Sequence, residues 1–343
     1  MPAAQARPAD HAQTHSDARL PNLAELEAAA KLVYAAMAPT PQFRWPLLEQ
    51  RAGVELWTKH ENHSPLGAFK MRGGLVYFDH LRRTQPETEC VVCATRGNHG
   101  QSVAFAAGRN GFRVVAVVPH GNSVEKNAAM RALGAEVIVS GDDFQASVET
   151  AAKLAEENGW HSMPSFHTRL AHGIGTYGLE LFRAAPDLDT VYVPIGLGSG
   201  ICGTMAARDA LGLKTKVVGV VSDAAPAYAL SFRARHAIDH PVSTRIADGM
   251  ACRTPHPDAL PFILAGVDHI VRVTDDEVEA AMRAIFADTH TVAEGAGAAP
   301  LAALLKERAR MQGRRVGLVM SGQNIDRPVM LAVLAGQVPI SSG

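Results

Sequence analysis

Short apolar runs and longer helical patterns alternate along the chain from about residue 22 onward. The apolar runs are rich in β-branched residues and lack the polar/apolar alternation of a half-exposed strand, so they indicate strands buried on both faces. They predict strands at Val91–Val92, Val114–Val118, Val137–Val139, Val191–Ile195, Val217–Val221, His269–Val273 and Val316–Met320. Ala-rich segments predict helices at Ala24–Met37, Gln101–Asn110, Ser123–Leu133, Ala146–Asn158, Ile201–Leu211, Asp275–Ala287 and Ala298–Arg310. This alternation predicts the α/β class with βαβ units and a mostly parallel sheet.

Composition and charge argue against several classes of protein. The 343 residues carry 33 Lys+Arg against 34 Asp+Glu, a formal net charge of −1. A nucleic-acid binder shows a basic excess, and so does a protein recruited to an anionic membrane surface. No run reaches the roughly 18 apolar residues of a spanning helix, and residues 1–22 lack the apolar core of a secretory signal. We expect no nucleic-acid or membrane partner, and we interpret residues 1–22 as a poorly ordered polar tail.

The cysteines and histidines indicate neither a disulfide framework nor a metal site. Four cysteines are too few for a disulfide scaffold, which makes a reducing cytoplasm the expected location. Cys90 and Cys93 form a lone C-x-x-C without a second pair, and His161, His167 and His172 lack zinc-type spacing. We therefore predict no bound metal.

The first segment with candidate chemistry is HENHSPLGAFKMRGG, residues 60–74. Pro65 and Gly67 mark a turn, and a helical pattern follows it. Lys70 lies between the apolar residues Phe69 and Met71. A lysine held in apolar surroundings has a lowered pKa and becomes a usable amine nucleophile. The alternative interpretation is a surface lysine at the start of a helix.

The second segment is CATRGNHGQSVAFAAG, residues 93–108, which follows a predicted strand and leads into a helix. Gly97 and Gly100 bring backbone N–H groups close to the helix N-terminus, where a carboxylate or phosphate can bind. Thr95, Asn98 and His99 add polar side chains at the same place. A solvated strand-to-helix turn explains the segment equally well.

The third segment is VYVPIGLGSGICGT, residues 191–204, in which a strand runs into a glycine-rich turn and a helix. Such a turn can wrap a phosphate with main-chain N–H groups. Gly198, Gly200 and Gly203 also form a G-x-G-x-x-G, and Asp223 follows at about the distance of a ribose-binding acid. A dinucleotide site is therefore a rival interpretation. A fourth segment, residues 318–326, carries Ser321 and Asn324, and these residues can equally cap the following helix.

Taken together, these segments resemble the pyridoxal-phosphate enzymes of the tryptophan synthase β-subunit fold (fold type II). Within that fold, the chain is most similar to the serine/threonine dehydratase family, which includes serine racemase. The resemblance extends from about residue 25 to about residue 330. It is carried by GAFKMRGG (67–74), ATRGNHGQSVA (94–104), HGIGTYGLE (172–180), GLGSG (196–200), IADGMACRTP (246–255), VAEGAGAAPLAAL (292–304) and MSGQN (320–324).

The resemblance implies a role for each candidate residue. Lys70 would hold the cofactor as a Schiff base and then act as the base at Cα, and Phe69 would pack beside the cofactor. Asn98 would lie at the 3′-oxygen, Glu294 near the ring, and Ser321 at the pyridine nitrogen. The phosphate would be held by Gly196, Leu197, Gly198, Ser199 and Gly200. The substrate carboxylate would be surrounded by Thr95, Arg96, Gly97 and His99.

The resemblance also implies an architecture. It predicts two open, twisted, mostly parallel sheets flanked by helices, with pyridoxal 5′-phosphate in the cleft between two domains. We expect residues 88–165 to form a small domain inserted into a large one, residues 23–87 plus 166–343. A homodimer or homotetramer is expected.

The predicted reaction is β-elimination on a β-hydroxy-α-amino acid such as L-threonine or L-serine, giving a 2-oxo acid and ammonia. A neutral Ser321 at the pyridine nitrogen favours this elimination over transamination. Two residues depart from the family pattern, since Ala68 and Arg96 stand where it has serines. Arg96 can bind a carboxylate bidentately or cover the mouth of the pocket. A bulkier aryl (phenylserine-like) or an acidic (hydroxyaspartate-like) substrate is therefore an alternative.

Three other functions remain open at this point. Arg96 replaces the serine that serves as the second base in serine racemase, which disfavours racemisation without excluding a racemase or a β-replacement enzyme. An NAD-dependent dehydrogenase would explain residues 198–203 alone. A binding protein that kept the fold would take up the cofactor without turnover.

Overall fold

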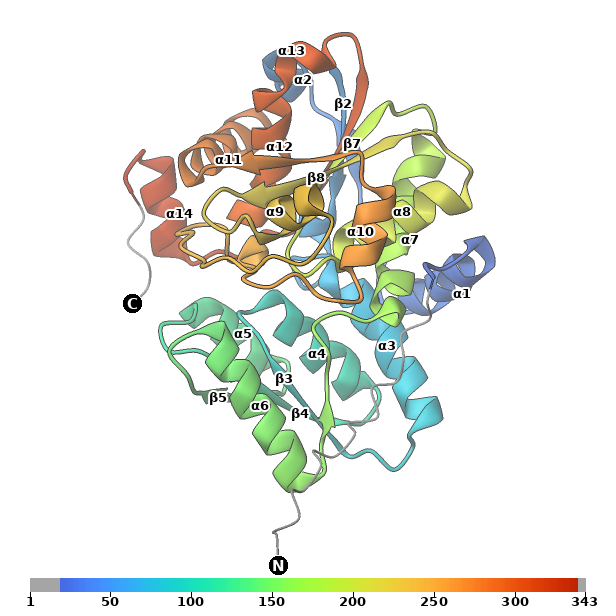
Figure 1. The fold of residues 1–343 in the computed structure, drawn as a ribbon, viewed down its shortest axis with the longest axis vertical. Coiled ribbons are helices and arrows are strands. Elements are labelled where there is room, and N and C mark those ends of the chain that lie inside the picture. The colour runs from blue at the N-terminus through green and yellow to red at the C-terminus, as the bar shows by residue number, and fades with distance from the viewer. Residues whose placement is uncertain (1–18, 339–343) are drawn as a thin grey trace, which may run out of the picture.

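The computed structural model describes residues 19–338 of the chain (Figure 1). Most of the predicted polar tail, residues 1–18, lies outside the described residues. The first helix, α1 (Leu23–Tyr34), begins where Asn22 and Glu25 form a reciprocal capping box. The side chain of Asn22 accepts from the Glu25 amide at 3.0 Å, which satisfies one of the free N–H groups of the first turn.

The larger of two sheets has six strands in the order β1-β2-β10-β7-β8-β9. Strand β1 pairs antiparallel with β2, and every other neighbouring pair is parallel. The strands are β1 (Gln42–Arg44), β2 (Glu55–His60), β7 (Thr190–Pro194), β8 (Lys216–Ser222), β9 (His269–Val273) and β10 (Arg315–Met320). The prediction of mostly parallel sheets is confirmed.

Helices cover both faces of the large sheet, as successive residues of one strand show. Val191 and Val193 of β7 join the apolar cluster beneath α7 (Thr168–Ala184) and α8 (Ser199–Ala210). Tyr192, between them, joins a separate cluster beneath α11 and α12. The other helices of this part are α2 (Pro46–Ala52), α9 (Ala227–Ala234), α10 (Leu260–Gly266), α11 (Asp275–Thr289), α12 (Gly295–Lys306), α13 (Arg308–Met311) and α14 (Arg327–Leu334).

The smaller sheet has four parallel strands in the order β5-β4-β3-β6. Its members are β3 (Cys90–Ala94), β4 (Arg113–Val118), β5 (Glu136–Val139) and β6 (His161–Ser162). Helix α6 (Phe144–Asn158) packs on one face, and α4 (Asn98–Arg109) and α5 (Val124–Ala132) lie on the other side (Figure 1). Helix α3 (Lys70–Thr84) contacts α4 of this part and α7 of the large part, so it links the two.

Three strands, β1, β2 and β6, were not predicted from the apolar pattern. Strand β2 reads ELWTKH, and its last three residues are buried although two of them are polar or charged. Lys59 and His60 have no exposed surface. The pattern failed here because buried ionisable side chains look like surface residues in a sequence.

Lys59 belongs to an ion cluster buried between β2, α3 and α7. The guanidinium of Arg72 donates to Glu61 Oε2 at 2.7 Å and to Glu180 Oε1 at 2.7 Å. Lys59 also pairs with Glu180, and its Nζ donates to the carbonyl of Thr40 at 2.7 Å. Two cations thus balance two carboxylates. Burial alone would lower the pKa of Arg72, but the two carboxylates outweigh it and the net shift is upward.

Arg72→Leu should destabilise the protein by about 3–5 kcal/mol, because Glu61 and Glu180 would stay buried without their guanidinium. Urea unfolding measures this loss. Arg83→Leu on the same helix is the matched control, since Arg83 is an exposed i,i+4 partner of Asp79. It should change the unfolding free energy by less than about 1 kcal/mol. Equal losses for both variants would contradict a central role for the cluster.

None of the helices within residues 19–338 combines the length and the apolar character that crossing a membrane requires.

Candidate active site

Four connections at the carboxyl ends of β2, β3, β7 and β10 meet in one place. The backbone N–H of Phe69 donates to Ser321 O at 3.1 Å, which joins the segments after β2 and β10. Lys70 Nζ lies 3.3 Å from Ser199 Oγ, which joins the first of these to the segment after β7. The carboxyl edge of a parallel α/β sheet is where such folds bind ligands.

Lys70 is the first residue of α3 and presents its amine to the start of α8. Its Nζ lies 5.0 Å from the centre of the Phe69 ring, so the surroundings on that side are apolar. Burial lowers the pKa of Lys70 to about 8, although the nearby carboxylate of Glu294 opposes the shift. A substantial fraction of the amine is therefore neutral, and nucleophilic, close to neutral pH.

The glycine-rich turn wraps the N-terminus of α8. Gly198 is the N-cap and has φ of 103°, a conformation that side chains rarely adopt. A Cβ there would also lie 2.7 Å from the Cβ of Ala259. The carbonyl of Leu197 is held by the Tyr228 hydroxyl at 3.1 Å. The turn therefore presents the free N–H groups of a twelve-residue helix, which favours an anion such as phosphate.

A second polar group connects the two parts of the molecule. Asn98 Nδ2 donates to Glu294 Oε1 at 2.7 Å, and Asn324 Nδ2 donates to Asn98 Oδ1 at 2.9 Å. Lys126 Nζ lies 3.5 Å from Glu294 Oε2. Burial raises the pKa of Glu294, and Lys126 and Asn98 oppose that rise. Asn324 and Lys126 were not predicted as site residues, since one reads as a helix cap and the other as an ordinary helical lysine.

The turn after β3 differs from the sequence-based expectation in one respect. The hydroxyl of Thr95 accepts from Gly97 N at 3.0 Å and from Gly100 N at 2.9 Å. These two N–H groups are therefore used within the turn. Burial lowers the pKa of His99 to about 3, with a smaller effect of Lys70, so its imidazole is neutral. Arg96, in the same turn, faces Asp248 at 3.5 Å.

A family described as "Pyridoxal-phosphate dependent enzyme" matches residues 33–322, most of the chain. The chain belongs to this family. The match confirms the predicted fold type II and the predicted cofactor, because enzymes of this family depend on pyridoxal phosphate.

Relatives and solved structures are consistent with the family. An L-threonine ammonia-lyase of Geobacter sulfurreducens is 34% identical over 278 residues, 81% of this chain and 69% of that one. A solved threonine deaminase of T.th. has a TM-score of 0.81 and 32% identity, covering 89% and 99% of the two chains. A pyridoxal 5′-phosphate-dependent aspartate racemase has a TM-score of 0.85 and 27% identity, covering 90% and 97%.

The residues present fit the cofactor. Three buried polar atoms make no hydrogen bond within residues 19–338: Arg96 Nε, His99 Nε2 and Glu294 Oε2. Buried polar atoms rarely stay unpaired, so these atoms indicate a polar ligand. The lysine amine, the amide of Asn98 and the N-terminus of α8 supply the donors that an aldehyde-bearing phosphate ester needs.

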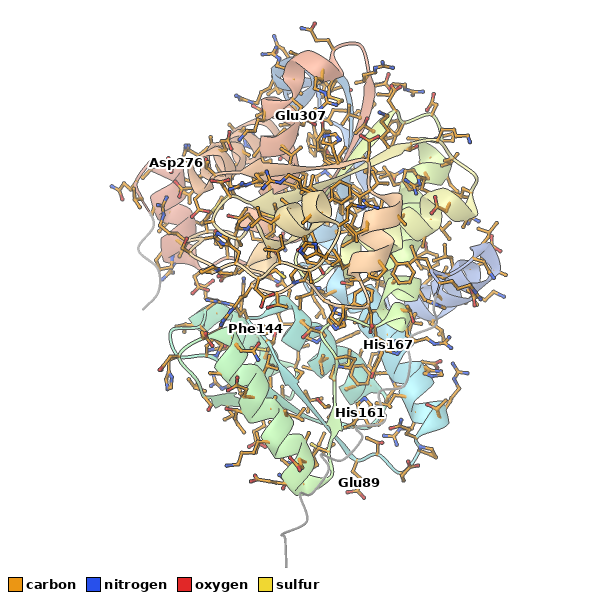
Figure 2. All side chains as sticks on the ribbon, viewed as in Figure 1. Glu89, Phe144, His161, His167, Asp276 and Glu307 are labelled. Carbon is orange, nitrogen blue, oxygen red and sulfur yellow. The ribbon has the colours of Figure 1, made fainter. Side chains whose placement is uncertain are left out.

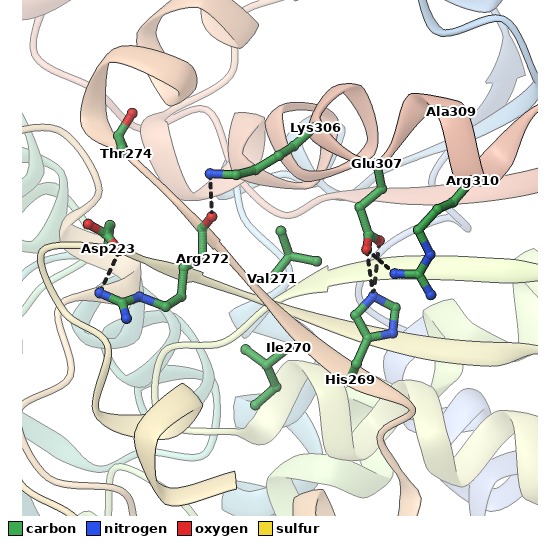
Figure 3. Close-up of a pocket in the computed structure, with 10 residues that line it drawn as sticks. All are labelled: Asp223, His269, Ile270, Val271, Arg272, Thr274, Lys306, Glu307, Ala309 and Arg310. Carbon is green, nitrogen blue, oxygen red and sulfur yellow. Dashed lines mark hydrogen bonds and ion pairs between the residues drawn. The ribbon is translucent and has the colours of Figure 1, made fainter. Parts of the chain in front are cut away.

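Other features of the chain do not compete with this site. No group of three or more His, Cys, Asp or Glu residues that could hold a metal occurs among residues 19–338. His161 and His167, labelled in Figure 2, both contact Tyr77 of α3: His161 by a 2.9 Å hydrogen bond and His167 by an edge-to-face ring contact. A depression of about 670 Å³ lies along edge strand β9 (Figure 3), where Lys306, Arg272 and Glu307 already have ionic partners.

Glu294→Gln should lower the pKa of Lys70 further below 8, because it removes the carboxylate that favours the ammonium form while the amide still accepts from Asn98. The rate at which apoprotein takes up pyridoxal phosphate rises with the neutral amine, so its pH midpoint should move to lower pH. Stopped-flow absorbance between pH 6 and 9, a range of roughly three units around that midpoint, measures it. Glu307→Gln, on α12's far end, is the control. A midpoint that rises or stays fixed in Glu294→Gln would contradict the coupling.

Proposed function

We propose that this protein is a pyridoxal-phosphate-dependent lyase. It removes water from a β-hydroxy-α-amino acid such as L-threonine or L-serine, and the product is a 2-oxo acid plus ammonia. The observation that carries the proposal is the meeting of a lysine of lowered pKa with the glycine-rich N-terminus of α8. The names of the relatives, threonine ammonia-lyase and threonine deaminase, support this reaction.

The proposed cofactor contacts come from both parts of the molecule. Lys70 binds the cofactor covalently, and residues 196–200 hold its phosphate at the start of α8. Phe69 packs against the ring, which is further positioned by Asn98, Glu294 and Ser321. Bound pyridoxal phosphate supplies an electron sink for the electrons of a broken Cα–H bond.

The chain's own residues then bind the substrate and move its protons. The N-terminus of α4, with Thr95, Gly97 and His99 around it, attracts the α-carboxylate. His99 is neutral, so it hydrogen-bonds without adding charge. The amine of Lys70, once free, accepts the Cα proton. The Cβ–O bond breaks and water leaves, and hydrolysis of the released enamine gives the 2-oxo acid and ammonia.

Lys70→Ala tests this function. The purified wild-type protein should show a visible absorption band from lysine-bound cofactor and should release 2-oxo acid and ammonia in equal amounts from L-threonine. The variant should lose the band and at least about a thousandfold in kcat, because it lacks both the attachment point and the base. Lys214→Ala, an exposed lysine, is the control and should keep both.

Other outcomes would favour the rival functions. D-amino acid or thioether product with little 2-oxo acid would indicate racemisation or β-replacement. Cofactor uptake without turnover would indicate a binding protein. A protein that stays colourless with pyridoxal phosphate but binds NAD would overturn the proposal in favour of a dehydrogenase.

We also propose the remaining features expected from the sequence. Residues 88–165 act as an inserted domain within 23–87 and 166–343, which is supported because all four strands of the small sheet come from that range. A cytoplasmic location is supported by four buried cysteines, all unpaired. A homodimer or homotetramer is supported by the exposed apolar side chains Phe43 and Leu47 near the β1 edge. Light scattering of the purified protein tests the assembly.

A further inference from the structure

Arg96 carries a buried hydrogen-bond donor that nothing in the described chain satisfies. Its Nε has no partner within residues 19–338, and its only ionic neighbour there is Asp248, 3.5 Å from Nη2. Both side chains are 36% exposed, so the pair is open to solvent on one side. A guanidinium with a free Nε edge binds carboxylates with two parallel hydrogen bonds, and an isolated 3.5 Å contact contributes little by comparison.

The position of Asp248 shows that Arg96 reaches into the candidate active site. The next residue, Gly249, packs its carbonyl against Gly196 of the glycine-rich turn so closely that a Cβ on Gly196 would overlap it. A Cβ on Gly249 would in turn lie 3.9 Å from Glu294 Oε1. Asp248 is close enough to Glu294 to raise the pKa of that carboxyl. The Arg96–Asp248 pair therefore lies beside the turn and the carboxylate that we assign to the cofactor.

A second cation stands next to Arg96. The stem of Lys126 fills the space beside Gly97, where any Cβ would overlap it. Lys126 is buried, and its ammonium is 3.5 Å from Glu294. Together with Lys70, three cations thus face the two carboxylates of Asp248 and Glu294. The site can accept an additional negative charge without becoming strongly anionic, and displacement of Asp248 from Arg96 leaves Asp248 in contact with water.

We infer that Arg96 receives a second carboxylate carried by the substrate, and that the substrate class is a β-hydroxy-α-amino dicarboxylic acid of the 3-hydroxyaspartate type. This inference rests on the proposed function and specifies its substrate. The α-carboxylate binds at the N-terminus of α4, and the β-carboxylate takes the Nε edge of Arg96. A methyl group, as in threonine, leaves that buried donor unsatisfied, and a site built to hydrogen-bond a group discriminates strongly against an analogue that lacks it.

The chemistry is the same elimination with a different product. The Cα–H and Cβ–O bonds break, one water leaves, and one water returns when the enamine hydrolyses. A four-carbon hydroxyamino diacid therefore yields oxaloacetate and ammonia, with no oxidant or reductant required. The β-carboxylate remains on the carbon skeleton throughout, so Arg96 can hold it from binding to release.

The test compares substrates on the holoenzyme. We expect kcat/KM for L-3-hydroxyaspartate, supplied as separate threo and erythro isomers, to exceed that for L-threonine at least about tenfold for one isomer. Arg96→Gln should reduce this ratio about ten- to a hundredfold, the effect of losing one or two charge-assisted hydrogen bonds. Arg131→Gln, the same change at an exposed arginine of α5, is the matched control and should keep the ratio.

Binding without turnover gives an independent readout. Succinate, a dicarboxylate without an amine, should bind the holoenzyme more tightly than butyrate in isothermal titration calorimetry. The difference should disappear in Arg96→Gln and persist in Arg131→Gln. Circular dichroism checks the fold of both variants, and the wild-type comparison needs neither.

The outcomes separate the two levels of the argument. Turnover of threonine or serine with no preference for hydroxyaspartate, and no preference for succinate over butyrate, would overturn the role of Arg96 and leave the lyase intact. No 2-oxo acid from any β-hydroxy amino acid would overturn the proposed function itself. A preference for hydroxyaspartate that survives in Arg96→Gln would show that another residue binds the second carboxylate.

Discussion

The buried ion cluster of Lys59, Glu61, Arg72 and Glu180 is the constraint on which the site depends. Arg72 lies two residues beyond Lys70 on α3, so the carboxylates that hold its guanidinium also fix the start of the helix that carries the candidate nucleophile. Helix α7 can approach because its Gly173 packs directly against the Arg72 carbonyl, where a Cβ would overlap. Such a cluster is costly to bury, and it is tolerated because each charge has a partner of opposite sign and good geometry.

The candidate site itself is held by polar contacts that cross between the two sheets. Asn98 and Lys126 reach from the small-sheet part to Glu294 at the N-cap of α12, and Ser123 pairs with Asp326 at the N-cap of α14. Interfaces of this polar kind can separate and close again at modest cost, unlike a continuous apolar core. The same contacts surround Lys70 with low-dielectric protein and a single carboxylate. That environment sets the balance between burial, which lowers its pKa, and Glu294, which opposes the shift.

Much of the fold was predictable because its strands are short, apolar and regularly followed by helices. The strand at His269–Val273 has the predicted bounds, and β4, β8 and β10 differ from prediction by one or two residues. Strand β2 escaped detection for a physical reason, since Lys59 and His60 are buried beside partners that come from distant parts of the sequence. Helix α7 carries three glycines whose purpose is close packing, and a pattern of apolar residues gives no sign of that.

The sequence by itself determined the α/β class, the family and the cofactor, because these follow from periodicity and from the order of local segments. Lys70 and Arg96 were recognisable as chemically unusual from their neighbours in the chain. Only the tertiary structure decided what those residues face. Lys126, Asn324 and Asp248 join the candidate site through contacts between segments far apart in sequence, and the unsatisfied Nε of Arg96 becomes visible only once those segments are in place. Burial and partnership are properties of the folded chain, since the same side chain is an ordinary surface charge until other segments exclude water from it.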